Sequence, residues 1–161
     1  MHTSTRALDG QLALVTGASR GLGRVIALGL ADEGASLHLV ADETEEELAQ
    51  VAAECRARCP SARVSHAMLD LARPDVPAEM VDAAVGEHGR IDILVNNAGV
   101  RIRKPFGQFS ADDFDQLMAV NLRAPMLAAQ AAAAHMRARG AGRIINVASQ
   151  LGTVTDTDAS L

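Results

Sequence analysis

The 161-residue sequence contains no tyrosine and no tryptophan, and it has only three phenylalanines. Without tyrosine, no phenol within these residues can act as a general acid, a general base or a nucleophile. Basic residues are also few, because 15 lysines and arginines stand against 20 aspartates and glutamates, for a net charge of -5. The basic residues are scattered rather than gathered on one segment, which argues against a nucleic-acid partner.

Segments that direct a protein to a membrane are lacking as well. The first ten residues hold one arginine and no apolar run, so they do not resemble a signal peptide. The longest apolar run, 124–136, is rich in alanine, contains Gln130 and is too short to cross a bilayer. We therefore expect a soluble, cytoplasmic protein that does not bind membranes.

The sequence also lacks an obvious metal-binding motif. Cys55 and Cys59 have no second cysteine pair or neighbouring histidine, so we interpret them as free thiols of a reducing compartment. The five histidines are scattered, and His38 and His135 are interpreted as packing residues. No metal site is predicted.

What the sequence does contain is a regular alternation of two kinds of segment. With 48% hydrophobic residues in one domain's length of chain, it can bury a core. Short apolar runs rich in Val, Leu and Ile predict strands at 12–16, 37–41, 64–69, 91–95 and 143–148. Helical spacing predicts helices at 23–33, 43–58, 77–88 and 111–139. This order predicts one α/β domain over residues 1–161, with a doubly wound parallel sheet covered on both faces by helices.

A glycine-rich segment joins the first strand to the first helix. It reads Thr16-Gly17-Ala18-Ser19-Arg20-Gly21-Leu22-Gly23. A dinucleotide pyrophosphate requires a tight turn, a backbone without Cβ atoms and the positive end of a helix dipole, all of which this segment can supply. The simpler alternative is a turn without a ligand. A nucleoside triphosphatase is not indicated, because the Gly-Lys-Ser/Thr signature is absent.

The residues that would choose between NAD and NADP point in two directions. Asp42 follows the second strand, where a carboxylate can bind the adenosine ribose hydroxyls, although Asp42 could equally be a helix N-cap with Glu45 behind it. Arg20, in the glycine-rich segment, could instead hold a ribose 2′-phosphate. The choice of dinucleotide stays open.

Two further signals involve asparagines. Asn96-Asn97-Ala98-Gly99 follows the fourth strand, at the sheet edge where the crevice of a doubly wound fold binds its ligand. Pro125 lies four residues after Asn121 and has no N–H, so the carbonyl of Asn121 loses its helical partner and the helix should kink. The kink could be a water site near the crevice or could have no function.

Taken in order, these motifs resemble the short-chain dehydrogenase/reductase family, whose fold is of the Rossmann type. The glycine-rich segment, Asp70-Leu71, the Asn-Asn-Ala-Gly turn, Asn121 and the segment 144–149 all occur in the family's sequence, and the resemblance covers residues 11–161. The resemblance implies an NAD(P)-dependent oxidoreductase that interconverts a small-molecule alcohol and a ketone. Family members are usually homo-oligomers.

The resemblance also implies roles for individual residues. Ser149 would hydrogen-bond the reacting substrate oxygen, and Asn121 would hold a water of the proton relay. Three sets of residues would bind the dinucleotide. The pyrophosphate would be bound by Gly17, Ser19, Arg20, Gly21, Leu22 and Gly23. The adenine would contact Asp70 and Leu71, and the nicotinamide-side ribose would contact Asn97, Ala98 and Gly99.

One expected motif is missing. The family has Tyr-x-x-x-Lys about a dozen residues after its serine, whereas this sequence has no tyrosine, and its one lysine, Lys104, precedes Ser149. We therefore expect the N-terminal portion of an enzyme, without the last strands of the sheet and with 143–148 as an apolar edge strand. The alternatives are a non-catalytic dinucleotide-binding protein and a non-functional truncated product.

The loop 100–106 carries Arg101, Arg103 and Lys104 beside the expected crevice. These charges could simply be solvated, or they could form an anion-binding wall for a carboxylate. The second interpretation fits a resemblance to family members that oxidise sugar acids such as gluconate.

Overall fold

Five parallel strands form one sheet in the order β3-β2-β1-β4-β5. The structure is a computed structural model and describes residues 6–105 and 107–149. The predicted doubly wound parallel sheet is confirmed. The strands are β1 (Leu12–Thr16), β2 (Ser36–Ala41), β3 (Val64–Met68), β4 (Ile93–Asn96) and β5 (Arg143–Asn146).

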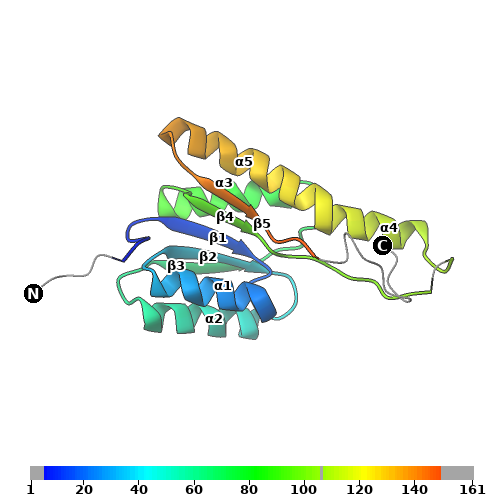
Figure 1. Ribbon diagram of the computed structural model, residues 1–161, viewed down its shortest axis with the longest axis horizontal. Coiled ribbons are helices and arrows are strands. Elements are labelled where there is room, and N and C mark those ends of the chain that lie inside the picture. Colours follow the sequence, from blue (N-terminus) through cyan, green and yellow to red (C-terminus); the bar gives the residue numbers. More distant parts are fainter. Residues whose placement is uncertain (1–5, 106, 150–161) are drawn as a thin grey trace, which may run out of the picture.

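Helices cover both faces of the sheet (Figure 1). On one face lie α1 (Gly21–Asp32) and α2 (Glu45–Arg58), and on the other lie α3 (Val76–His88) and α5 (Ala124–Arg139). The chain reaches α5 through α4 (Ala111–Met118) and a π-helical segment, η1 (Ala119–Arg123). No helix in the part of the chain that the structure describes is long and apolar enough to cross a membrane.

The strand residues alternate between two apolar cores, one on each face. In β1, Ala13 and Val15 join the core beneath α1 and α2, whereas Leu12 and Leu14 join the core beneath α3 and α5. All four side chains are almost completely buried. A strand that is buried on both faces has a continuous apolar sequence, which explains why these runs do not alternate with polar residues.

The long predicted helix 111–139 is divided in three. The expected interruption is confirmed as the π-helical segment η1, in which the amide of Ala124 donates to the carbonyl of Ala119, five residues earlier. Pro125 lies in the first turn of α5, where a missing N–H does no harm. A capping box begins α4, because Ser110 and Asp113 each accept a hydrogen bond from the other's backbone amide.

Strand β5 is the outer strand on one side of the sheet. It pairs with β4, but its four residues are exposed, including Ile144 and Ile145. The strand ends at Asn146, two residues earlier than predicted.

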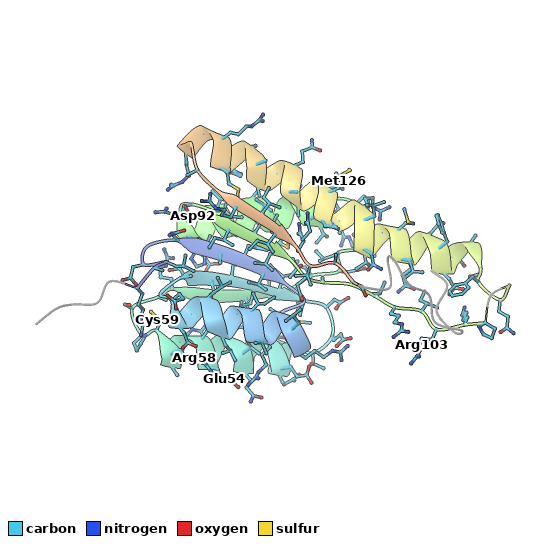
Figure 2. All side chains as sticks on the ribbon, in the orientation of Figure 1. Glu54, Arg58, Cys59, Asp92, Arg103 and Met126 are labelled. Carbon is cyan, nitrogen blue, oxygen red and sulfur yellow. The ribbon has the colours of Figure 1, made fainter. Side chains whose placement is uncertain are left out.

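Asp92 joins three parts of the chain at the amino edge of the sheet, below the end of α5 (Figure 2). It precedes β4 and does not belong to the strand, contrary to the predicted range 91–95. Its carboxylate accepts the amide of Leu12 at 2.8 Å and both the Nε and a terminal nitrogen of Arg90 at 2.6 Å. Arg139, at the end of α5, lies 3.7 Å away. Burial opposes the charge, but the hydrogen bonds outweigh it and keep the pKa of Asp92 below its usual value.

The substitution Asp92→Asn should lower the free energy of unfolding at pH 7 by about 1.5–3 kcal/mol, the range for a hydrogen bond to a charged group. Because the folded-state pKa is lowered, this stabilisation is present above the unfolded-state value of about 3.9 and is lost as the pH falls through the folded-state value. Urea unfolding at pH 7 and below pH 4 measures both effects.

The control is Asp75→Asn, because the ion pair of Asp75 with Arg73 is exposed and asparagine is as good an N-cap residue for α3 as aspartate. This variant should unfold at the same urea concentration as the unmodified protein. Equal midpoints for the two variants at pH 7 would contradict the role of Asp92.

Candidate functional site

A crevice of about 270 Å³ opens at the carboxyl edge of the sheet, between the ends of β1 and β4. The strand order reverses at this point, since β2 lies on one side of β1 and β4 on the other. Doubly wound sheets bind ligands at such a reversal. The described residues that line the crevice are Gly17, Ser19, Arg20, Gly21, Leu22, Gly23, Ala41, Asp42, Glu43, Leu69, Leu71, Asn97, Ala98, Gly99, Val100 and Val120.

Two glycines in the crevice wall cannot be replaced without displacing backbone. A Cβ atom on Gly23 would lie 2.0 Å from the carbonyl oxygen of Gly17 and 2.5 Å from the side-chain nitrogen of Asn97. A Cβ atom on Gly17 would lie 2.9 Å from Ala98, and the φ of +64° at Gly17 is itself unfavourable for other residues. The glycines are therefore required by the close approach of the loop after β4.

Asn97 holds that loop against the glycine-rich segment. Its side-chain amide donates to the carbonyls of Thr16 and Gly17, at 3.0 and 3.1 Å. The hydroxyl oxygen of Thr16 in turn accepts the backbone amides of Asn97 and Ala98, both at 3.0 Å. Six polar groups from the ends of two strands are thus satisfied by one another, and the crevice between the loops has a fixed shape.

The first turn of α1 forms one wall of the crevice. The N-cap residue, Arg20, makes no side-chain hydrogen bond to the helix, and the first turn contains no acidic residue. The first N–H groups of a helix lack partners within the helix, and they carry the positive end of its dipole. A Cβ atom on Gly21 would meet nothing within 4 Å. The wall can therefore receive an anion such as a phosphate.

The structure brings together eleven of the twelve predicted dinucleotide-binding residues. The exception is Asp70, which does not line the crevice. Its carboxylate instead accepts the backbone amide of Ala72 at 2.8 Å and so shapes the turn after β3. The neighbours of Asp70 on both sides, Leu69 and Leu71, do line the crevice.

At the far end of the crevice, Asp42 is not a helix cap. The N-cap of α2 is Thr44, so the alternative role considered for Asp42 is excluded. Asp42 lines the crevice, as do Arg20 and Glu43, whose side chains form an ion pair. Two carboxylates and one guanidinium therefore meet here, and the guanidinium is already paired.

A second groove, between α5 and the end of β5, contains the surroundings of the predicted catalytic residues. It is lined by Asn121 and by residues 146–148, immediately before Ser149. The side chain of Asn121 accepts the backbone amide of Val100 at 2.8 Å and donates to the Val100 carbonyl at 2.9 Å. Ser149 is exposed. Asn121 thus anchors the loop that follows the Asn-Asn-Ala-Gly turn.

The basic loop is partly neutralised by the helix that follows it. The ammonium group of Lys104 lies 2.5 Å from the carboxylate of Asp113 in the capping box. Hydrogen bonds from Lys104 and Ser110 lower the pKa of Asp113 to about 2. Arg101 and Arg103 are exposed, whereas Phe106, at the end of this loop, lies outside the described residues. Of the three cations on the loop, Lys104 is thus already paired with a carboxylate.

Sequence reasoning missed Thr16 and Glu43. Thr16 is the last residue of β1, and its position in the sequence does not predict the three hydrogen bonds of its hydroxyl group. The hydroxyl accepts two backbone amides and donates to the carbonyl of Val95 at 3.4 Å. Glu43 is one of several acidic residues near the start of α2, and only the structure distinguishes it by its ion pair with Arg20.

The sequence and the fold both match known proteins. A family model described as short chain dehydrogenase matches residues 11–160. Gluconate 5-dehydrogenase of Gluconobacter oxydans (strain 621H) is 40% identical over 149 residues, which are 92% of this chain and 57% of that protein. The 2-dehydro-3-deoxy-D-gluconate 5-dehydrogenase of Escherichia coli (strain K12) is 41% identical over 155 residues, which are 94% of this chain and 58% of that protein.

Among solved structures, a metagenomic short-chain oxidoreductase in complex with NADP superposes with a TM-score of 0.86 at 39% identity, over 94% of this chain and 68% of that one. The chain thus spans somewhat more than half the length of the two curated relatives. Since the family match extends over residues 11–160 and the crevice, the strand order and the glycine cradle agree with it, the chain belongs to the short-chain dehydrogenase family.

Proposed function

We propose that the protein is an NAD(P)-dependent oxidoreductase that interconverts an alcohol and a ketone, and that these residues form its dinucleotide-binding part. The observation that carries the proposal is the glycine cradle, in which Gly17 and Gly23 have no room for a side chain beside Asn97. The cradle leads directly into the uncapped first turn of α1. This combination suits a pyrophosphate, which needs close backbone approach and a helix N-terminus.

Different residues of the crevice would bind different parts of the dinucleotide. The backbone of residues 17–23 would receive the pyrophosphate, Asp42 the adenosine ribose, Leu71 the adenine, and residues 97–99 the nicotinamide ribose. When bound, the nicotinamide supplies or accepts the hydride. The chain's own contribution is to hold the dinucleotide in a crevice whose walls are already joined by Asn97 and Thr16.

We propose Ser149 and Asn121 as the residues that act on the substrate side. The Ser149 hydroxyl would hydrogen-bond the substrate oxygen. Asn121 would hold the loop at Val100 and a water of the proton relay beside the π-helical segment. π-helical turns are frequent at functional sites.

The proposed substrate is a sugar acid or a related polyol. Two relatives about 40% identical are named for oxidation or reduction at carbon 5 of gluconate compounds. The exposed arginines Arg101 and Arg103 provide positive charge on the loop that Asn121 anchors. A carboxylate on the substrate would suit that charge.

A second candidate is a dinucleotide-binding protein without turnover, which requires the crevice alone. Both candidates require the crevice, so dinucleotide binding tests what they share. Reduction of NAD or NADP by gluconate then separates them, because only the enzyme produces the reduced dinucleotide.

The first test is a thermal shift with NADH and NADPH. A ligand that binds only the folded state raises the melting temperature, and the unmodified protein should respond to at least one of the two. The substitution Gly23→Ala should weaken binding by more than about tenfold, because its Cβ atom collides with Gly17 and pushes the cradle apart.

The matched control is Gly29→Ala in the same helix, where a Cβ atom meets nothing within 4 Å. This variant should bind normally and melt at the same or a slightly higher temperature, since alanine favours a helix over glycine. A normal thermal shift in Gly23→Ala would contradict the proposed cradle.

The second test concerns the choice of dinucleotide. We propose that the protein prefers NADH to NADPH. Asp42 and Glu43 both place negative charge where the adenosine ribose would lie, and Glu43 already pairs with the guanidinium of Arg20. The substitution Glu43→Gln removes one charge and releases Arg20 for a 2′-phosphate. It should improve NADPH binding about fivefold relative to NADH, as measured by fluorescence titration of both dinucleotides. The double variant Glu43→Gln/Arg20→Ala should lose that gain, and an unchanged ratio in the single variant would refute the assignment.

The third part of the proposal is self-association through α4, η1 and α5. Phe114, Met118, Leu122 and Met126 follow one another at intervals of four residues, and all four are substantially exposed. Figure 2 has Met126 on the outer side of α5. Apolar side chains in such a row are typical of a helix that packs against a partner.

The substitution Met126→Glu should therefore shift the protein toward the monomer, because it introduces a charge into the apolar row. Sedimentation velocity measures the change. The control is Val25→Glu on α1, where valine is equally exposed at 60% but lies outside the row. The same sedimentation coefficient for both variants would show that the row is not the contact.

A further inference from the structure

A cluster of histidines lies at the amino edge of the sheet, at the opposite ends of the strands from the crevice. In the register of β2 and β3, His38 stands beside Ser65, so their side chains share a face of the sheet. That face is the one covered by α3, whose last residues include Glu87 and His88. Three elements that are distant in sequence thus deliver two imidazoles, a carboxylate and a hydroxyl to one place.

The hydroxyl of Ser65 bridges the two imidazoles. Its oxygen lies 2.8 Å from Nδ1 of His38 and 2.7 Å from Nε2 of His88. The carboxylate of Glu87 lies 3.8 Å from Nδ1 of His38. One donor atom from each of His38, Glu87 and His88 lies within 4.8 Å of the other two.

Hydrogen bonding within the cluster leaves one nitrogen of each imidazole ring without a partner. Among the residues that the structure describes, Nε2 of His38 and Nδ1 of His88 are buried without a hydrogen-bond partner. The side chain of His38 is only 4% exposed, so water does not readily substitute for that partner. Buried polar atoms without partners are uncommon in folded proteins, so each ring has one nitrogen that contacts Ser65 and a second nitrogen that is open to a ligand. The two rings stand edge to face, with their centroids 6.2 Å apart.

We propose that His38, Glu87 and His88 form a binding site for a divalent transition metal of the zinc type, which joins β2 to the end of α3. Two imidazoles and one carboxylate are a donor set that suits zinc, cobalt and nickel and does not suit magnesium or calcium. The fourth position is open to water. The site is separate from the dinucleotide crevice and does not depend on the proposed function.

The cluster needs only a small contraction to reach a metal's geometry. Tetrahedral zinc with bonds of about 2.1 Å places its donor atoms about 3.4 Å apart, so the donors must approach by at most about 1.4 Å from their present limit of 4.8 Å. Glu87 is exposed and His88 is half-buried at the end of a helix, so both can move.

Cobalt is the direct probe, because tetrahedral Co²⁺ with nitrogen and oxygen donors absorbs visible light. Titration of the full, tag-free chain with Co²⁺ should saturate at one equivalent with tetrahedral absorption bands, and Zn²⁺ should abolish the bands and raise the melting temperature. His88→Gln and Glu87→Gln should each weaken Zn²⁺ binding by more than about tenfold.

Two variants separate metal binding from packing. His135→Gln removes another histidine that pairs with a carboxylate, Asp82 at 2.9 Å, and should leave Zn²⁺ affinity unchanged. Ser65→Ala removes the hydroxyl bridge but no proposed donor, and it should bind Zn²⁺ within about threefold of the unmodified protein. Circular dichroism without metal checks that each variant is folded. The proposal is overturned by the absence of a saturable site, by unchanged affinity in His88→Gln, or by equal losses in His88→Gln and Ser65→Ala.

Discussion

The crevice depends on the hydrogen bonds of the Asn97 side chain. Its amide nitrogen binds the carbonyls of Thr16 and Gly17 and thereby draws the loop after β4 onto the end of β1. At position 17 this approach leaves no room for a side chain, since a Cβ atom there would lie 2.9 Å from both Ala98 and Asn97. At position 23 the nearest obstacle is the carbonyl oxygen of Gly17, at 2.0 Å, so the two glycines are required by two different neighbours.

At the opposite edge of the sheet, Asp92 performs the corresponding task. It accepts the Leu12 amide, while its backbone pairs with Leu12 and Arg143. The central strands β1 and β4 are thus joined at both ends. The carboxylate of Asp92 joins them at the amino edge, and the side-chain amide of Asn97 joins them at the carboxyl edge. Because strands joined at both ends resist sliding, the register between β1 and β4 at the crevice is fixed.

Much of this arrangement is accessible from the sequence. Strands buried on both faces leave continuous apolar runs, and Pro125 reveals the interruption after Asn121, so the layers and the break were predictable. Gly17, Gly23 and Asn97 were predictable because tight turns at the ends of strands favour glycine and asparagine. Asp70 was assigned to the crevice and instead supports a turn. The pairs Arg20 with Glu43 and His38 with Ser65 could not be foreseen, since each depends on which strand ends lie together in space.

The π-helical segment has a consequence for how the long helix tolerates change in length. A π turn holds one residue more than an α turn, so η1 behaves as an insertion that the helix has absorbed. Removing one residue there would restore a regular α-helix and leave the later residues facing the sheet as they do now. If all residues were kept and the wide turn became α-helical, everything after it would rotate by about 100°. Ala124, Ala128, Ala132 and Met136 would then turn away from the sheet that they now cover. The two ends of this helix contact different neighbours, and the wide turn is what keeps both in phase.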